Sequence, residues 1–351
     1  MIFVRNAFGE RFEVPPGYLN TASIGVPPQR AGAAVAEAVR GWCTGAAQPA
    51  DFDGDVHCAR AAFGRLVGVA PEQVTAGVTV SQLVGLVAAS LPGGARVLAA
   101  RGDFASTRFP FHAQTERGIV VDEVELAELP AALEAEPCDL VAVSVVQSAD
   151  GRVVDLDALR EAAARTGTAV LLDATQAAGW LPLSLDWADY VVATGYKWLM
   201  CPRGAAWMAV RPDRLDALVP HAANWCAGQD PWASLYDTPM RLATDARRLD
   251  LSPVWLAQRG AAAVLPWLAG LDLTEVHRHC TGLADTFRAE WGLPPTGSAI
   301  VSVPMTDPTA AVHRLAEAGV TATVRAGALR LSFHLYNTED DVETVLRALH
   351  G

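Results

Sequence analysis

Two stretches near the middle of the chain decide the fold: Ala169-Val-Leu-Leu-Asp173-Ala-Thr-Gln176 and Asp189-Tyr-Val-Val-Ala-Thr194-Gly-Tyr-Lys197. In each, a short apolar run ends at a loop that carries a polar side chain. Similar runs lie on both sides and alternate with alanine-rich segments of helical length. The seven expected strands span 73–76, 96–99, 119–124, 140–146, 169–172, 189–193 and 205–210. This pattern predicts a large α/β domain built on a mostly parallel sheet that is covered on both faces.

The pattern changes after residue 250. A helical region rich in Ala, Leu and Trp runs from about 254 to 291, and shorter expected strands and helices follow it. We therefore expect a second, smaller α+β domain. The predicted division is an N-terminal segment at 1–30, a large domain at 31–250 and a small C-terminal domain at 251–351.

The composition is that of a globular protein. Hydrophobic residues make up 51% of the 351 residues and charged residues 19%, whereas disordered chains combine low hydrophobicity with high net charge. The formal net charge is −12, so nucleic acid and anionic membrane are poor candidates as partners. No apolar run approaches the ~20 residues of a spanning helix.

We expect a cytoplasmic protein without a metal site or disulfides. Charged residues at positions 5, 10, 11 and 13 interrupt the N-terminus before an apolar signal region could form. The six cysteines show no Cys-x-x-Cys spacing, so they are expected to remain thiols. His277, His279 and Cys280 fit no closed zinc set and lie in an expected helix, so a solvated helix face is favoured there.

The polar residues at the two strand ends suggest chemistry. Because parallel strands present their carboxyl ends at one edge of the sheet, Asp173 and Lys197 are expected to face a common crevice. A lysine there can form a Schiff base, and an aspartate can pair with the pyridinium nitrogen of pyridoxal phosphate. The alternative is a plain structural ion pair between the two side chains.

Further loops favour the cofactor. The segment 171–176, Asp189 and the segment 194–204 resemble the Asp-x-x-Gln/His and Ser/Thr-x-His/Tyr-Lys motifs of the class V aminotransferases. This family of fold type I pyridoxal phosphate enzymes includes cysteine desulfurases, kynureninases and isopenicillin N epimerase, and the resemblance covers nearly the whole chain. It implies that Lys197 forms the Schiff base with pyridoxal 5′-phosphate, that Asp173 holds the pyridinium nitrogen and that Gln176 binds the ring's 3′-oxygen.

The same resemblance implies a phosphate site. Gly77-Val78-Thr79 resembles the family's Gly-Thr-Thr loop before a helix, where orphan N–H groups hold an anion. Val78 replaces a threonine, so only its backbone N–H can serve. Thr194 would add a hydroxyl, and Tyr196, where many members have histidine, could reach the phosphate or the substrate. An ordinary strand-to-helix turn is the alternative for the first loop.

Other positions are assigned by the resemblance to the ring and its edge. Phe104 matches the residue that stacks on the cofactor, although a phenylalanine most often belongs to the core. Gln147 and Ser148 match the loop that carries an amide near the 3′-oxygen and the substrate. A solvated strand end is the alternative reading of that loop.

Substrate binding is implied by the two ends of the chain. The stretch 330–338 resembles the family's Arg-x-Ser-x-x-x-Tyr-Asn-Thr motif, in which the arginine grips the substrate carboxylate, so Arg330 takes that role and Arg325 is a lesser candidate. The segment 18–22 resembles the N-terminal segment that lines the substrate pocket, and Asn20 is expected to contact the substrate. Ser252 matches a segment that crosses to the partner's phosphate, which implies a homodimer.

The expected function is that of an aminotransferase. A nicotinamide enzyme would need a Gly-x-Gly-x-x-Gly turn, and the chain has no Gly-x-Gly. A non-catalytic protein of this fold has little reason to keep Lys197 beside Asp173. No cysteine follows Cys280, which argues against a persulfide-forming desulfurase. A C–S or C–C lyase or an epimerase remains an alternative, because these reactions share the first steps.

Overall fold

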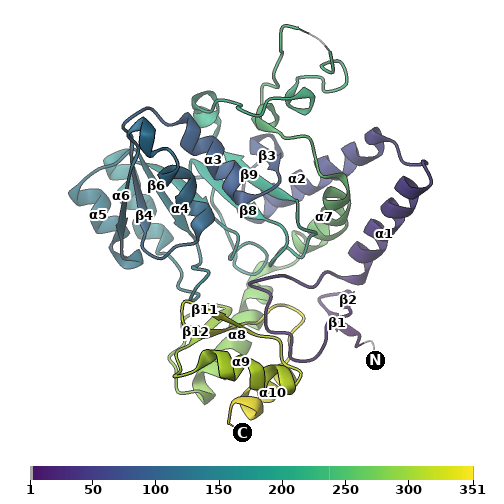
Figure 1. The fold of residues 1–351 in the computed structure, drawn as a ribbon, viewed down its shortest axis with the longest axis vertical. Helices are drawn as coiled ribbons and strands as arrows, with labels where there is room; N and C mark the ends of the chain where they lie inside the picture. Colours follow the sequence, from purple (N-terminus) through teal and green to yellow (C-terminus); the bar gives the residue numbers. More distant parts are fainter. Residues whose placement is uncertain (1–2, 237, 351) are drawn as a thin grey trace.

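The fold is described from a computed structural model that covers residues 3–236 and 238–350. Figure 1 shows a large unit that carries a central sheet, with a smaller unit beneath it. Within the described residues, the central sheet has seven strands in the order β3-β9-β8-β7-β6-β4-β5. These strands are β3 (Val74–Gly77), β4 (Arg96–Ala100), β5 (Val120–Val124), β6 (Leu140–Ser144), β7 (Ala169–Asp173), β8 (Tyr190–Thr194) and β9 (Ala206–Val210).

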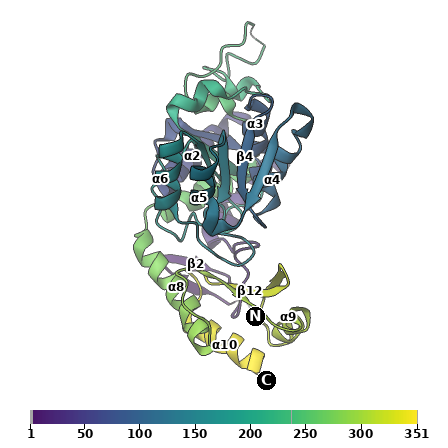
Figure 2. The ribbon, with the colours of Figure 1, turned by 90° about the vertical axis from the view of Figure 1, so that its left-hand side faces the viewer.

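The sheet confirms the predicted α/β class. Strands β5, β4, β6, β7 and β8 are parallel, and β9 runs antiparallel to both of its neighbours. The helices of the large unit are α1 (Gln29–Cys43), α2 (Asp53–Val67), α3 (Val80–Ser90), α4 (Ala105–His112), α5 (Leu129–Ala135), α6 (Leu156–Thr166) and α7 (Trp255–Leu268). Figure 2 shows helices on both sides of the sheet.

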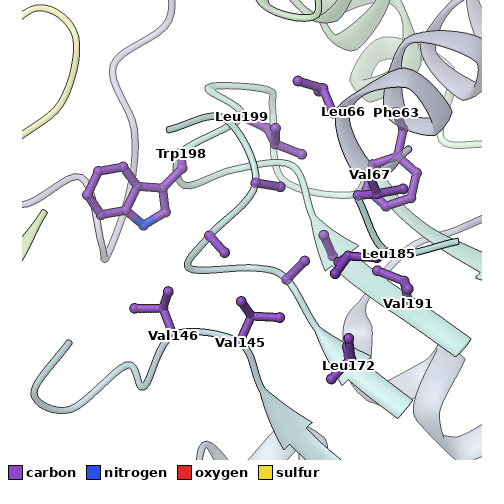
Figure 3. Packing of buried hydrophobic residues seen from close by; sticks show 14 of the residues in the cluster. Phe63, Leu66, Val67, Val145, Val146, Leu172, Leu185, Val191, Trp198 and Leu199 are labelled. Atoms are coloured by element: carbon purple, nitrogen blue, oxygen red, sulfur yellow. The ribbon is translucent and has the colours of Figure 1, made fainter. Parts of the chain in front are cut away.

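Successive residues of the central strands serve opposite faces, as the two-residue period of a strand requires. Leu172 and Val191 belong to one apolar cluster, which also contains Phe63 of α2 (Figure 3). Their neighbours Leu171 and Val192 belong to a second cluster with residues of α3. Both faces of β7 and β8 are therefore buried, which fixes the ends of these strands in place.

The small unit is built on an antiparallel sheet in the order β10-β12-β11. Its elements are α8 (Leu273–Glu290), β10 (Ile300–Val303), α9 (Pro308–Glu317), β11 (Thr323–Arg325), β12 (Ala328–Ser332) and α10 (Glu339–His350). A hairpin of β1 (Arg5–Ala7) and β2 (Glu10–Phe12) lies near the N-terminus. The third apolar cluster, with Phe287 and Phe333, lies in this unit and includes Leu19 from the N-terminal segment.

The expected domain limits differ from this packing at one helix. Helix α7 falls within the predicted small domain but packs against α1 and α2 of the large unit. Its apolar side chains, among them Ala261 and Leu265, belong to the cluster of the large unit. Among the described helices, none is long and apolar enough to span a membrane.

Candidate active site

The site forms where β7 and β8 end side by side. Asp173 is the last residue of β7, and Lys197 follows the end of β8 by three residues. Both side chains line one cavity of about 310 Å³. The remaining lining residues are Val78, Thr79, Val80, Ser81, Phe104, Ser106, Ser144, Ser148, Thr175, Gln176, Thr194, Tyr196 and Arg203. The structure thus gathers most of the predicted cofactor residues in one place.

Lys197 is the only lysine in the sequence. Its side chain is buried, and its amine lies 5.0 Å from the ring centroid of Phe104 and 5.8 Å from that of Tyr196. Burial lowers the pKa of Lys197 to about 8; the charge of Asp173 opposes this shift, and the charges of Arg330 and Arg325 add to it. The amine therefore loses its proton at a lower pH than an ordinary lysine does.

Asp173 is buried, and it forms no ion pair with any residue that the structure describes. Thr107 donates its hydroxyl to Asp173 Oδ2 at 3.1 Å, and the backbone N–H of Thr175 donates to Oδ1 at 2.8 Å. Burial raises the pKa of Asp173, although the two Thr175 hydrogen bonds lower it. Within the described residues, no ion pair shorter than 4.0 Å joins Asp173 to Lys197.

This separation argues against the simple ion pair and fits the cofactor. A buried carboxylate is costly unless a cation meets it. Two buried opposite charges that share a cavity without touching leave room for a group that can satisfy both. Pyridoxal phosphate carries a cationic ring nitrogen for Asp173 and an aldehyde carbon for Lys197. The donor set of the cavity therefore fits the cofactor that the sequence predicted.

The predicted phosphate site lies at the N-terminus of α3. Thr79 caps this helix, because its Oγ1 accepts the N–H of Gln82 at 3.2 Å, and it also lies 3.2 Å from Ser81 Oγ. In the described part of the chain, the N–H groups of Thr79, Val80 and Ser81 have no hydrogen-bond acceptor. Together with the helix dipole, these groups suit a phosphate.

Gly77 and Val78 form the turn that precedes α3 at the predicted phosphate site. A Cβ on Gly77 would lie 2.7 Å from Gln82 Oε1 and 2.8 Å from Leu83 Cδ2, so a larger residue there would displace these two side chains. The Val78 N–H, expected to serve the phosphate, points instead to Gln82 Oε1 at 3.4 Å. Thr194 and Tyr196 line the same cavity from the end of β8, where the sequence predicted them.

The amide of Gln176 is committed to the protein. Its Nε2 donates to the carbonyl of Ala22 at 3.1 Å and to Ser148 Oγ at 2.9 Å, and its Oε1 accepts the indole N–H of Trp198 at 2.7 Å. This differs from the expectation that Gln176 itself binds the ring's 3′-oxygen. Trp198 directly follows Lys197 in the sequence. Nothing in the sequence indicates that its indole N–H donates to the amide oxygen of Gln176.

Arg330 is buried, and no described carboxylate forms an ion pair with it. Its Nη1 donates to the carbonyl of Ser148 at 2.5 Å and to Ser148 Oγ at 3.2 Å, and its Nη2 donates to Ser23 Oγ at 2.7 Å. Burial, with a smaller effect of the Arg325 charge, lowers the pKa of Arg330 to about 10. Among the described side chains, no carboxylate lies within 4.0 Å of its guanidinium. An external carboxylate would meet this need.

Four predicted residues do not line the cavity, and Arg330, described above, is one of them. Gln147 turns its amide to the carbonyl of Ser144 at 3.3 Å. Asn20 pairs through its backbone with Ser332, and its buried Oδ1 has no hydrogen-bond partner among the described residues. Ser252 is exposed and lies outside the cavity of its own chain.

Several lining residues were missed. Ser144 ends β6, so the same strand-end rule that found Asp173 could have found it. Its N–H and hydroxyl donate to Asp103 at 2.7 and 2.6 Å, which fixes the loop that carries Phe104. Thr175 lies inside a quoted motif but was given no role. Ser81, Ser106 and Arg203 had no distinguishing signal in the sequence.

Comparisons with known proteins identify a matching family and similar sequences. The aminotransferase class-V family model matches residues 114–290, half of the chain. An uncharacterized aminotransferase of Bacillus subtilis (strain 168), YcbU, is 28% identical over 302 residues, which cover 81% of this chain and 80% of the relative. The isopenicillin N epimerase of Amycolatopsis lactamdurans is 27% identical over 335 residues, with 83% of each chain covered.

A solved structure shows the same fold. The apo cysteine desulfurase from Thermococcus onnurineus NA1 superposes with a TM-score of 0.82 at 19% identity, covering 95% of this chain and 94% of that chain. At this identity the likeness concerns the fold alone.

Proposed function

The chain belongs to the aminotransferase class-V family and is a pyridoxal-phosphate-dependent enzyme, and on that premise we propose that it is an aminotransferase acting on an α-amino acid. One observation carries the proposal. Lys197 and Asp173 are buried in one cavity without pairing, and the buried Arg330 nearby has no carboxylate partner among the described residues. These residues together meet the needs of a cofactor and of an α-amino acid.

The side chains divide the work as follows. When bound, pyridoxal phosphate supplies a conjugated ring that delocalises the electron pair left at Cα after its proton departs. Asp173 keeps the ring nitrogen protonated, held in place by Thr107 and Thr175. The N-terminus of α3 holds the phosphate. Arg330 binds the substrate carboxylate, and Lys197 removes the α-proton as a general base, for which a pKa of about 8 is suitable.

Elimination by a C–S or C–C lyase is the second candidate. Tyr196 lies in the same cavity as Lys197 and carries a hydroxyl that can protonate a leaving group. Epimerisation, named for the Amycolatopsis lactamdurans relative, commonly needs a proton donor on each side of Cα. Phe104, the expected stacking residue, has no proton to give.

We also propose that the enzyme does not form a persulfide on itself. Cys201, the cysteine closest in sequence to Lys197, is buried and does not line the cavity, and burial raises its pKa far above the usual range. The sequence has no cysteine after Cys280. A reactive thiolate needs exposure and a low pKa.

A product panel tests the proposal. The purified protein, supplied with amino acids and a keto-acid acceptor, is assayed separately for new amino acid, keto acid and ammonia. An aminotransferase makes keto acid without ammonia and only when the acceptor is present. Ammonia with a keto acid in the absence of acceptor supports the lyase. Lys197→Ala is the matched inactive control, and activity in that variant would overturn the proposal.

We further propose a cytoplasmic homodimer. All six cysteines are free, as in a reducing compartment. Exposed Trp232 and Trp255 would be covered by a second subunit, and Ser252 would reach the partner's phosphate. The segment before Ser252 is firmly anchored, because Asp250 accepts hydrogen bonds from Arg60, Thr75 and the Ala76 N–H. Sedimentation checks this, and a fully active monomer would contradict it.

A further inference from the structure

Two guanidinium groups converge on one neutral oxygen at the edge of the site. Arg330 Nη2 donates to Ser23 Oγ at 2.7 Å, and Arg325 Nη2 lies 3.5 Å from the same atom. The arginines lie on the adjacent antiparallel strands β12 and β11, where Thr323 faces Arg330. A hydroxyl oxygen accepts such bonds but carries no charge to neutralise the two cations.

Other buried or partly buried arginines of the chain do receive a carboxylate. Arg60 is paired through both terminal nitrogens with Asp250, and Arg5 is paired in the same way with Asp341. Arg325 and Arg330 form no ion pair with any described residue. Within the described residues these two guanidinium groups therefore have no carboxylate partner, and both charges contribute to the lowered pKa of Lys197.

The position of Arg325 is defined by the hairpin that carries it. Its Nη1 donates to the Val324 carbonyl at 2.8 Å and to Thr323 Oγ1 at 3.1 Å, which leaves Nη2 directed at Ser23. The next two residues, Ala326 and Gly327, have φ values of 46° and 77°. Two positive φ angles in a row make a tight turn that suits a two-stranded hairpin. Arg325 is thus held beside Arg330 although its side chain is exposed.

An α-carboxylate supplies one negative charge, and Arg330 is the buried cation that suits it. The guanidinium of Arg325 then remains without an anionic partner among the described residues. We propose that the substrate is an α-amino acid with a second anionic group, a carboxylate or sulfonate, which Arg325 receives while Arg330 holds the α-carboxylate. Ser23 Oγ lies between the two arginines and contacts both. This inference rests on the proposed action on α-amino acids and adds the charge class of the substrate.

Matched ligands test the inference on the holoenzyme. L-Aspartate against L-asparagine, and L-glutamate against L-glutamine, are titrated while the visible absorbance of the cofactor is followed. We expect the acidic member of a pair to bind about tenfold more tightly, as charge-assisted contacts of this kind allow. Arg325→Gln removes that preference and leaves the neutral members within about twofold. Arg347→Gln, at an exposed arginine of α10, is the control and changes neither.

The outcomes are distinguishable. If neutral and acidic members bind equally to the wild type, the inference is overturned while the proposed function stands. If Arg325→Gln weakens both members alike, Arg325 contacts the α-carboxylate and the inference fails. If the preference survives in Arg325→Gln but is lost in Arg203→Gln, the second anion lies elsewhere in the cavity and the assignment to Arg325 fails. If no amino acid alters the absorbance, the proposed function itself fails.

Discussion

The indole N–H of Trp198 donates to Gln176 Oε1 at 2.7 Å. Because an indole nitrogen can only donate, this bond fixes which end of the Gln176 amide carries the N–H groups. Both of those groups are used within the protein, and one of them is donated to Ser148 Oγ. Since Arg330 also donates to Ser148 Oγ, the Ser148 hydroxyl is left with its own proton to donate into the cavity.

Ser148→Ala should therefore change the cofactor's spectrum without emptying the site. We expect the variant to keep the cofactor, and the pH at which its visible band changes should rise, because the ring oxygen loses a hydrogen-bond donor. Ser148→Thr should restore the wild-type titration. Gln147→Ala, next to it but turned away from the cavity, is the control. An unchanged titration in Ser148→Ala would remove this role from the hydroxyl.

Asp173→Asn should bind cofactor but lose most turnover. An amide cannot keep the ring nitrogen protonated, and an unprotonated pyridine delocalises electrons poorly. Absorbance at saturating cofactor and the rate of α-proton exchange measure the two effects separately. Turnover equal to that of the wild type would take Asp173 out of its assigned role.

Arg330→Ala should lower kcat/KM for carboxylate substrates by about 10- to 150-fold, since charge-assisted hydrogen bonds contribute roughly 1.5–3 kcal/mol. Arg330→Lys should rescue only part of the loss, because an ammonium cannot make the paired contact. Decarboxylated amines should be poor substrates of the wild type and indifferent to the substitution. Intact activity in Arg330→Ala would place the carboxylate elsewhere.

The lowered pKa of Lys197 predicts a pH-dependent stability of the cofactor-free protein. In the unfolded chain a lysine keeps its proton up to about pH 10.4, whereas the folded protein releases it above about 8. The unfolded state therefore binds more protons between these values, so the free energy of unfolding should rise with pH across this window and be independent of this group below it. Urea unfolding of Lys197→Met should lack this rise. A parallel slope in both proteins would refute the lowered pKa.

Asp250→Asn should lower the free energy of unfolding by about 3–5 kcal/mol, because it leaves the buried Arg60 without its counter-charge. Asp216, which pairs with Arg248 but is exposed, provides the matched control. We expect Asp216→Asn to change stability by less than about 1 kcal/mol. Chemical denaturation of the two variants would settle the contrast, and equal losses would contradict it.

The strand-end rule explains why much of the site could be predicted. Asp173 and Thr194 end adjacent parallel strands, and the apolar runs before them set both their position and their partner. The sequence at a strand end does not indicate which side chains contact it from distant segments of the chain. Ser23 meets Arg330 only because the N-terminal segment docks on β12, about three hundred residues away in sequence. The packing of α7 on α1 and the orientation of the Gln176 amide depend on such distant contacts too.

Because the sequence contains one lysine, it has a single side-chain amine that can react with an aldehyde. Aldehydes often attach to surface lysines, and such adducts obscure the true cofactor site, but here the only such amine is the buried Lys197. Hydride reduction of the coloured protein should therefore leave one tagged side chain, found in one peptide after digestion. Occupancy of the site can be counted directly by mass spectrometry in a crude mixture. The fraction of chains modified at Lys197 therefore equals the fraction that had bound the cofactor.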